Sequence, residues 1–256
     1  MLKKKWGKEG QMFSYLFNGE RMLLISAVAP AIALMIYIYK KDKLEKEPRR
    51  LLVSLVILGI VSTFIAMLTE TLGENILNGM AVKNELYYRF LMYFCVVAVS
   101  EEGVKYLFLR IRTWNNPAFN CRFDGVVYAV FVSLGFALFE NIMYVFNYGF
   151  ATALVRAVFS IPGHTCFAVV MGVFYGIAKQ LQVDLRRALS FVMRVLSLFF
   201  AVIFHGAYDF FATMEGTDYD WSFYVFYIVM FAICFILVKK TSKADGYFRL
   251  QKIYYD

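Results

Sequence analysis

The chain has 256 residues, of which 61% are hydrophobic and 19% aromatic, and its mean hydropathy is +0.58. Soluble domains have roughly 45–50% apolar residues, so this composition excludes a soluble globular protein and predicts a chain that crosses a membrane several times. The net charge of +8 does not indicate nucleic-acid binding, because the lysines and arginines gather at the ends of apolar runs. The cysteines stand singly and predict neither a CxxC pair nor a disulfide framework.

Apolar stretches in chain order define the expected membrane spans, each near the ~20 residues that a bilayer core requires. They lie at about residues 22–39, 51–68, 88–109, 123–146, 160–178, 195–212 and 221–238. A short mixed patch before them, at residues 12–17, predicts an interfacial helix. We therefore expect an all-α, polytopic membrane bundle of about seven transmembrane helices. Residues 1–21 would form a polar segment, 22–238 the membrane domain and 239–256 a basic tail.

The basic residues alternate between loops and predict the orientation of the bundle. The loop at residues 40–50 carries six lysines and arginines, and the loops near 110–122 and 179–194 and the tail are also basic. The remaining loops hold at most one basic residue each. The positive-inside rule then places the basic loops in the cytoplasm and the amino terminus outside. Five basic residues before Met22 oppose this placement of the amino terminus.

The third span contains two adjacent carboxylates and an ammonium group, Glu101, Glu102 and Lys105. Ionisable groups at membrane depth cost a few kcal/mol each, so this set indicates a functional site. On a helix Lys105 lies four residues after Glu101 and three after Glu102, so it can reach either carboxylate. One ammonium can compensate the charge of only one carboxylate, so the other should be protonated or should share its proton. Such a carboxylate is suited to take a proton from water near neutral pH.

Other spans carry further ionisable residues at overlapping depths: Glu140, His164, His205 and Asp209. His164 and His205 are the only histidines in the chain, and histidine titrates near neutral pH. His205 and Asp209 are four residues apart, so the carboxylate can fix the orientation of the ring. At 1.5 Å per residue these groups fall roughly 5–12 Å from the outer ends of their helices, and Glu101 falls roughly 15 Å from the end of its own. One shared polar site would require such an overlap.

Less specific interpretations apply to each of these residues alone. Lys105 and its glutamates would form a structural ion pair, and His164, which follows Pro162 and Gly163, would be an interior histidine. The whole set would also suit a proton relay in a transporter or a scaffold without catalysis. Arg156 is expected at the membrane interface. Gly172 and Gly176 form a GxxxG pair that indicates close helix approach.

Three charged motifs in separate spans resemble the signature of the PrsW family of intramembrane proteases, distant relatives of the CAAX prenyl endopeptidases. They are Glu101-Glu102-x-x-Lys105, Phe136-x-x-x-Glu140 and His205-x-x-x-Asp209. Further stretches look like the same family: Tyr39 to Asp42 with Glu47-Pro48, Asp124 to Tyr128, and Pro162-Gly163-His164. The resemblance covers about residues 39–209.

The resemblance implies a multi-pass protein of the bacterial cell membrane that hydrolyses a peptide bond inside or at the edge of the bilayer. The implied partners are membrane lipids and a single-pass substrate, an anti-sigma factor cut at site 1 in envelope stress signalling, with no nucleic acid. Glu101 or Glu102 would be the general base, and Glu140 would position the water. His205, held by Asp209, and His164 would donate hydrogen bonds to the oxyanion.

We expect no cofactor, and a catalytic zinc held by His164, His205 and Glu140 or Asp209 is the alternative. The sequence contains no HExxH motif to support it. Neither histidine has a neighbouring Ser or Cys in an obvious dyad, so no covalent intermediate is expected.

Overall fold

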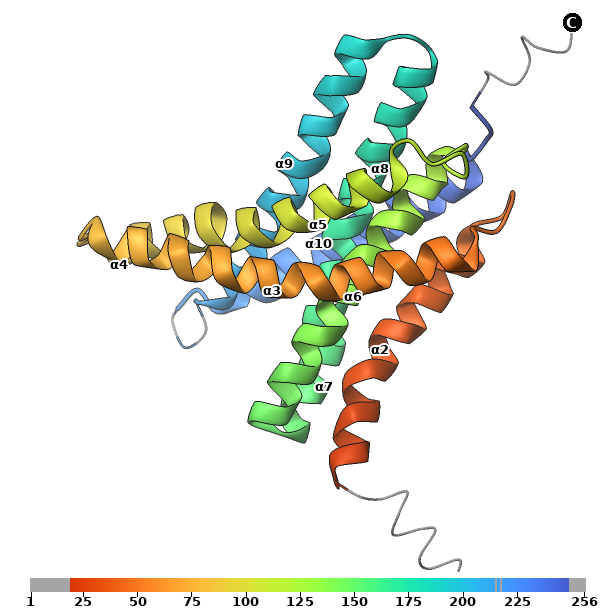
Figure 1. Ribbon diagram of the computed structural model, residues 1–256. Helices are drawn as coiled ribbons and strands as arrows, with labels where there is room; N and C mark the ends of the chain where they lie inside the picture. Colours follow the sequence, from red (N-terminus) through yellow and green to blue (C-terminus); the bar gives the residue numbers. More distant parts are fainter. Residues whose placement is uncertain (1–18, 215, 217, 249–256) are drawn as a thin grey trace, which may run out of the picture.

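The protein is all-helical in the computed structural model, which describes residues 19–214, 216 and 218–248 (Figure 1). In the described part of the chain, the β-contacts are limited to an isolated bridge between Cys121 and Tyr247. The helices are α2 (Gly19–Lys41), α3 (Arg49–Gly79), α4 (Glu85–Phe90), the π-helix η1 (Leu91–Val97), α5 (Ala98–Thr113), α6 (Arg122–Tyr148), α7 (Phe150–Val158), α8 (Ser160–Val183), α9 (Arg187–Ala212) and α10 (Trp221–Lys243).

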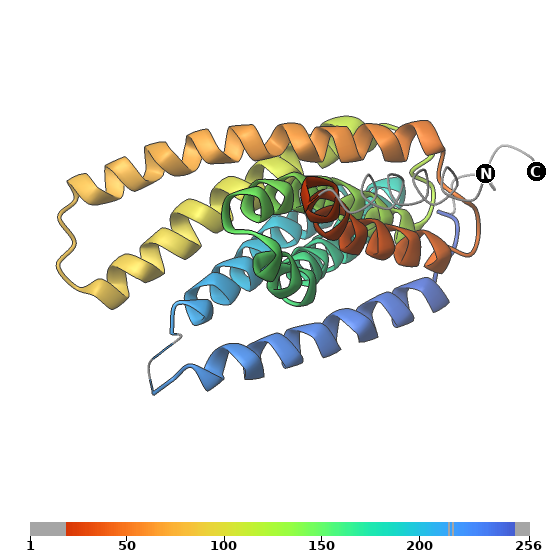
Figure 2. The ribbon, with the colours of Figure 1, turned by 90° about the horizontal axis from the view of Figure 1, so that it is seen from below.

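Helix α6 is the centre of the bundle. Nearly every residue between Phe123 and Ala137 is buried, and α6 contacts α2, α3, α5, α7, α8 and α10. Its neighbours approach at glycines: a Cβ on Gly135 would lie 2.3 Å from the Val56 carbonyl oxygen of α3, and one on Gly172 of α8 would lie 2.5 Å from the Val126 Cα. The expected close approach at Gly172 is therefore a backbone contact between α6 and α8. Figure 2 shows α3 and α10 as the outer layers on opposite sides of this core.

Six helices in the described residues are long and apolar enough to cross a membrane, which confirms a multi-pass membrane bundle. They include α2, α3, α6, α9 and α10, and the sixth is α7 joined to α8. The third expected span corresponds to residues 85–113, which are helical throughout but divided into α4, η1 and α5. This segment carries the buried ionisable residues, which lower its hydropathy. π-Helical turns of this kind often mark functional sites.

Several boundaries differ from those expected. Helix α3 continues to Gly79, eleven residues beyond the predicted end of its span, so residues expected in a polar connection are helical. Helix α7 was not predicted, and the backbone at Phe159 separates it from α8. The patch at residues 12–17 lies outside the described residues. The domain limits expected at residues 21 and 238 stay a prediction. In the structure, α2 begins at Gly19 and α10 continues to Lys243.

The basic loops meet at one end of the bundle, where they are linked by hydrogen bonds. Ser242 donates to the Lys41 carbonyl at 2.6 Å, and the Phe248 amide donates to the Asn120 carbonyl at 2.8 Å. Between these loops Glu47 is buried, accepts from the Tyr128 hydroxyl and shares a hydrogen bond with Asp124. Burial raises the pKa of Glu47 to about 7. The common location of these loops agrees with the charge alternation.

Candidate active site

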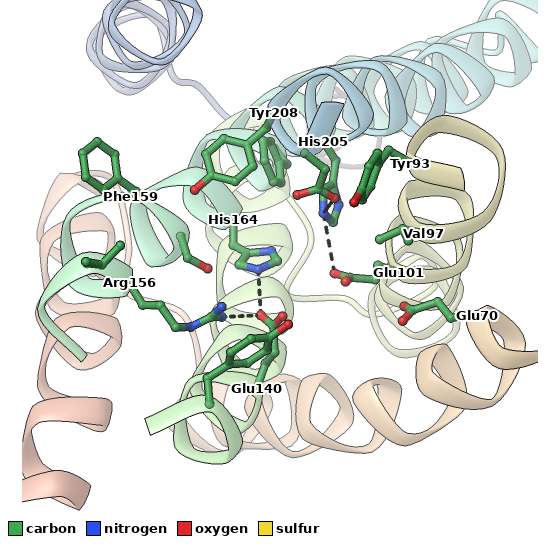
Figure 3. A pocket seen from close by; sticks show the side chains of 15 residues that line it. Glu70, Tyr93, Val97, Glu101, Glu140, Arg156, Phe159, His164, His205 and Tyr208 are labelled. Atoms are coloured by element: carbon green, nitrogen blue, oxygen red, sulfur yellow. Dashed lines mark hydrogen bonds and ion pairs between the residues drawn. The ribbon is translucent and has the colours of Figure 1, made fainter. Parts of the chain in front are cut away.

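A cavity of about 380 Å³ lies between α3, the η1–α5 segment, α6, α7, α8 and α9 (Figure 3). Its walls carry several of the ionisable residues that the sequence places within the membrane spans. Its polar and charged lining consists of Glu70, Tyr93, Glu101, Glu140, Tyr144, Arg156, Ser160, His164, His205, Tyr208 and Asp209. Glu101, Glu140, His164 and His205, which come from four helices, therefore face one space, as a shared polar site requires.

Lys105 lies at the back of this cavity and joins the two adjacent glutamates. Its Nζ is 2.8 Å from Glu101 Oε2 and 2.8 Å from Glu102 Oε1, and all three side chains are buried. The ammonium also sits 3.9 Å from the centre of the Phe136 ring, which adds a cation–π contact from α6. The helical spacing of three and four residues makes this pairing local to α5, and the Phe136 contact fixes α5 against α6.

His205 is held between carboxylates at both ring nitrogens. Its Nδ1 lies 2.9 Å from Glu102 Oε1, and its Nε2 lies 3.2 Å from Asp209 Oδ2 and 3.9 Å from Glu101 Oε2. The Phe167 ring stacks on the imidazole with centroids 4.6 Å apart. The spacing of four residues on α9 therefore orients the ring as expected, and Glu102 adds a second contact from α5.

Glu140 connects α6 to α7 and α8. Its Oε2 accepts from Arg156 Nη2 at 2.7 Å and lies 3.0 Å from His164 Nε2. Arg156 Nε also donates to Asn141 Oδ1 at 2.9 Å, and Asn141 Nδ2 donates to the Ala27 carbonyl of α2 at 2.7 Å. These contacts fix the short helix α7 against three other helices.

The structure brings all seven predicted site residues together, although Glu102 and Lys105 lie behind the cavity wall. Two charged cavity residues were not expected there from the sequence. Arg156, expected at the interface, is paired with Glu140, and Glu70, expected in a connecting loop, is on α3. Neither residue has a local signal in the sequence, because Arg156 is paired with a residue 16 positions away on α6 and the residues that face Glu70 come from other helices.

Comparisons with known proteins agree with this geometry. The model of the PrsW family, described as intramembrane metalloproteases, matches residues 47–238. The chain belongs to the PrsW family. It is 31% identical over 233 residues to Protease PrsW of Geobacillus kaustophilus, covering 90% of this chain and 96% of that protein. Protease PrsW of Bacillus subtilis is 32% identical over 224 residues, with 87% and 95% covered, and no solved structure matches the chain. The chain is therefore a membrane-embedded protease.

Because the PrsW family is described as metalloproteases, the residues of this site are compared with the ligands that a metal ion would need. Among the described residues, Glu101, Glu102 and His164 can bring one ligand atom each within 4.8 Å of one another, a set that differs from the expected His164, His205 and Glu140. Lys105 Nζ contacts all three at 2.8, 2.8 and 3.4 Å. The ammonium thus fills the position of the cation, so these residues as arranged do not fit a metal ion.

Proposed function

We propose that this PrsW protein is an endopeptidase that cleaves a single-pass membrane protein in the bacterial cell membrane with a water molecule activated by Glu101. The observation that supports this proposal best is the convergence of carboxylates and imidazoles from α5, α6, α8 and α9 on one cavity. Each of these groups would be costly alone in hydrocarbon, and together they supply proton acceptors and hydrogen-bond donors for hydrolysis.

Glu101 is the better general base of the two adjacent glutamates because it alone lines the cavity. Glu102 is fully buried, and its Oε1 is engaged by both Lys105 and His205. A general base must reach the proton that it removes, directly or through one water. Glu102 therefore acts as a positioning residue that orients Lys105 and His205.

The attacking water has a place between Glu101 and His205. Glu101 Oε2 and His205 Nε2 are 3.9 Å apart, so one water can bond to both. Glu101 takes a proton from this water as its oxygen bonds to the substrate carbonyl carbon. That proton then passes to the leaving amine as the peptide bond breaks, and the products are a carboxylic acid and an amine.

The carbonyl oxygen becomes an oxyanion and needs hydrogen-bond donors. His164 was expected to supply one, but its Nε2 contacts Glu140 and its Nδ1 lies 3.4 Å from Lys105 Nζ. His205 Nε2 is engaged by Asp209 at 3.2 Å and faces the attacking water, whereas Arg156 keeps N–H groups beyond its two bonds to Glu140 and Asn141. We assign the oxyanion to Arg156, with Glu140 and His164 holding its side chain in place.

The proposed substrate is an anti-sigma factor with one membrane span, cut at site 1 on its extracytoplasmic side. The family resemblance supports this choice. In the structure the cavity residues lie toward the poorly basic ends of α3 and α9, which the charge alternation places outside.

The proposed mechanism needs no metal, because the Lys105 ammonium already lies among Glu101, Glu102 and His164, where a cation would be held. Purified protein in lipid vesicles should cleave a single-pass reporter in the presence of a chelator. Activity that is lost on chelation and regained with zinc would contradict the metal-free mechanism.

The proposed function is tested by Glu101→Gln in the same vesicles. We expect reporter cleavage to fall by about 10²-fold or more, because removal of a general base typically costs 10²–10⁴-fold. Glu74→Gln is the matched control, since Glu74 is an exposed glutamate on α3 that does not line the cavity. Cleavage by Glu101→Gln at the rate of the control would overturn the role of Glu101.

A further inference from the structure

Glu70 lines the cavity but has no part in the network described above. It lies on α3 next to Glu101 and on the opposite side of the cavity from Arg156, with its carboxylate directed toward the cavity (Figure 3). The side chain is half-buried. Its electrostatic neighbours include Glu101, Glu140, Lys105 and His205. Glu70 therefore belongs to the cavity wall although its helix is peripheral.

The other charged groups on this wall have protein partners. Glu101 is paired with Lys105, Glu140 with Arg156, and Asp209 with His205. Within the described residues the Glu70 carboxylate makes no hydrogen bond or ion pair. Its cationic neighbours Lys105 and His205 are already engaged by other carboxylates. The cavity thus holds one carboxylate available to a ligand.

The charge balance of the site favours a cationic ligand. Glu70, Glu101, Glu102, Glu140 and Asp209 supply five carboxyl groups, whereas Lys105 and Arg156 are the permanent cations. A cleft with walls of low dielectric and an excess of one charge concentrates ligands of the opposite charge. An acidic substrate side chain would meet like charge here, which disfavours its binding.

We propose that Glu70 is a specificity residue that binds a lysine or arginine side chain of the peptide substrate close to the scissile bond. This inference rests on the proposed function, because it places the scissile bond at Glu101 in the same cavity. A long basic side chain can lie along the apolar part of the wall, formed by Val97 and Tyr93 of η1, and still bring its charge to Glu70. The substrate class is therefore a membrane-anchored segment with a basic residue beside the cleavage site.

The test compares matched single-pass reporters that differ in one residue near the cut: arginine, glutamine or glutamate. The full-length protein is used in lipid vesicles, and kcat/KM is measured for each reporter. The wild type should prefer the arginine reporter, and Glu70→Gln should lower the arginine-to-glutamine ratio of kcat/KM by about tenfold or more. Glu70→Lys should reverse the preference toward the glutamate reporter. Glu74→Gln, one turn further along α3 and exposed, is the control and should keep the wild-type ratio.

Other outcomes separate the two proposals. If the wild type cuts all reporters at one rate, or if Glu70→Gln lowers all of them by the same factor, Glu70 does not select a basic residue. In that case loss of cleavage in Glu101→Gln would still support the proposed function. If Glu101→Gln cleaves like the wild type, the proposed function fails, whatever the reporter ratios show.

Discussion

Gly172→Ala tests whether the packing of α6 against α8 positions the active site. A Cβ at residue 172 would lie 2.5 Å from the Val126 Cα and 2.6 Å from the Gly125 carbonyl oxygen, both backbone atoms. Ordinary contact begins near 3.4 Å, so the two helices must separate by about 0.9 Å. Neither helix can retreat easily, because both are largely buried. Overpacking of this kind destabilises by about 1–3 kcal/mol.

The same separation acts on the site, because α6 carries Glu140 and α8 carries His164. Their 3.0 Å contact would lengthen to as much as about 3.9 Å, which is beyond a hydrogen bond. Since a displacement of 1 Å can cost about 10²-fold in rate, we expect reporter cleavage to fall at least tenfold.

Thermal unfolding and reporter cleavage, both measured in lipid vesicles, check this prediction. Gly103→Ala is the matched control because a Cβ there meets nothing within 4 Å, although Gly103 follows Glu102 directly. If Gly172→Ala matched Gly103→Ala in unfolding temperature and in kcat/KM, the α6–α8 contact would not position the site.

Three other substitutions have expected outcomes of defined sign. Lys105→Met leaves two buried carboxylates without their cation and should destabilise by about 3–5 kcal/mol in denaturation experiments, with partial recovery in the double variant Lys105→Met/Glu102→Met. In Arg156→Lys the planar fork of donors is lost, so the side chain cannot keep its bonds to both Glu140 and Asn141. We expect kcat for reporter cleavage to fall about tenfold or more while the protein stays folded. An unchanged kcat would argue against Arg156 as the oxyanion donor. Burial raises the pKa of Glu47 from 4.5 to about 7, so its folded state binds the proton more tightly. Stability should therefore fall as the pH rises from about 4.5 to 7, and Glu47→Gln should weaken that dependence of the unfolding temperature.

The sequence predicts the helices well because apolar runs of membrane length are a strong local signal. It also identifies Lys105 with its glutamates and His205 with Asp209, since each set lies on one helical face. It fails where the decisive contact is between helices. Glu70 follows the apolar run of α3, and no residue near it in sequence indicates that η1 and α5 pack beside it.

The break at Phe159 was missed for a related reason. Helix α7 is too short to be recognised as a span, and its position depends on Arg156, Glu140 and Asn141 from two helices. The choice between Glu101 and Glu102 also needed three-dimensional structure, because adjacent residues differ only in which one reaches the cavity.

The central claim is that side chains from separate helices form one catalytic unit around this cavity. It is tested most directly by kcat/KM for reporter cleavage in a double-mutant cycle of Glu101→Gln and Glu140→Gln. Residues that act as a unit give strongly non-additive losses, so the double variant should be about as slow as the slower single variant. Losses that multiply would show that Glu101 and Glu140 act independently and would contradict the shared site.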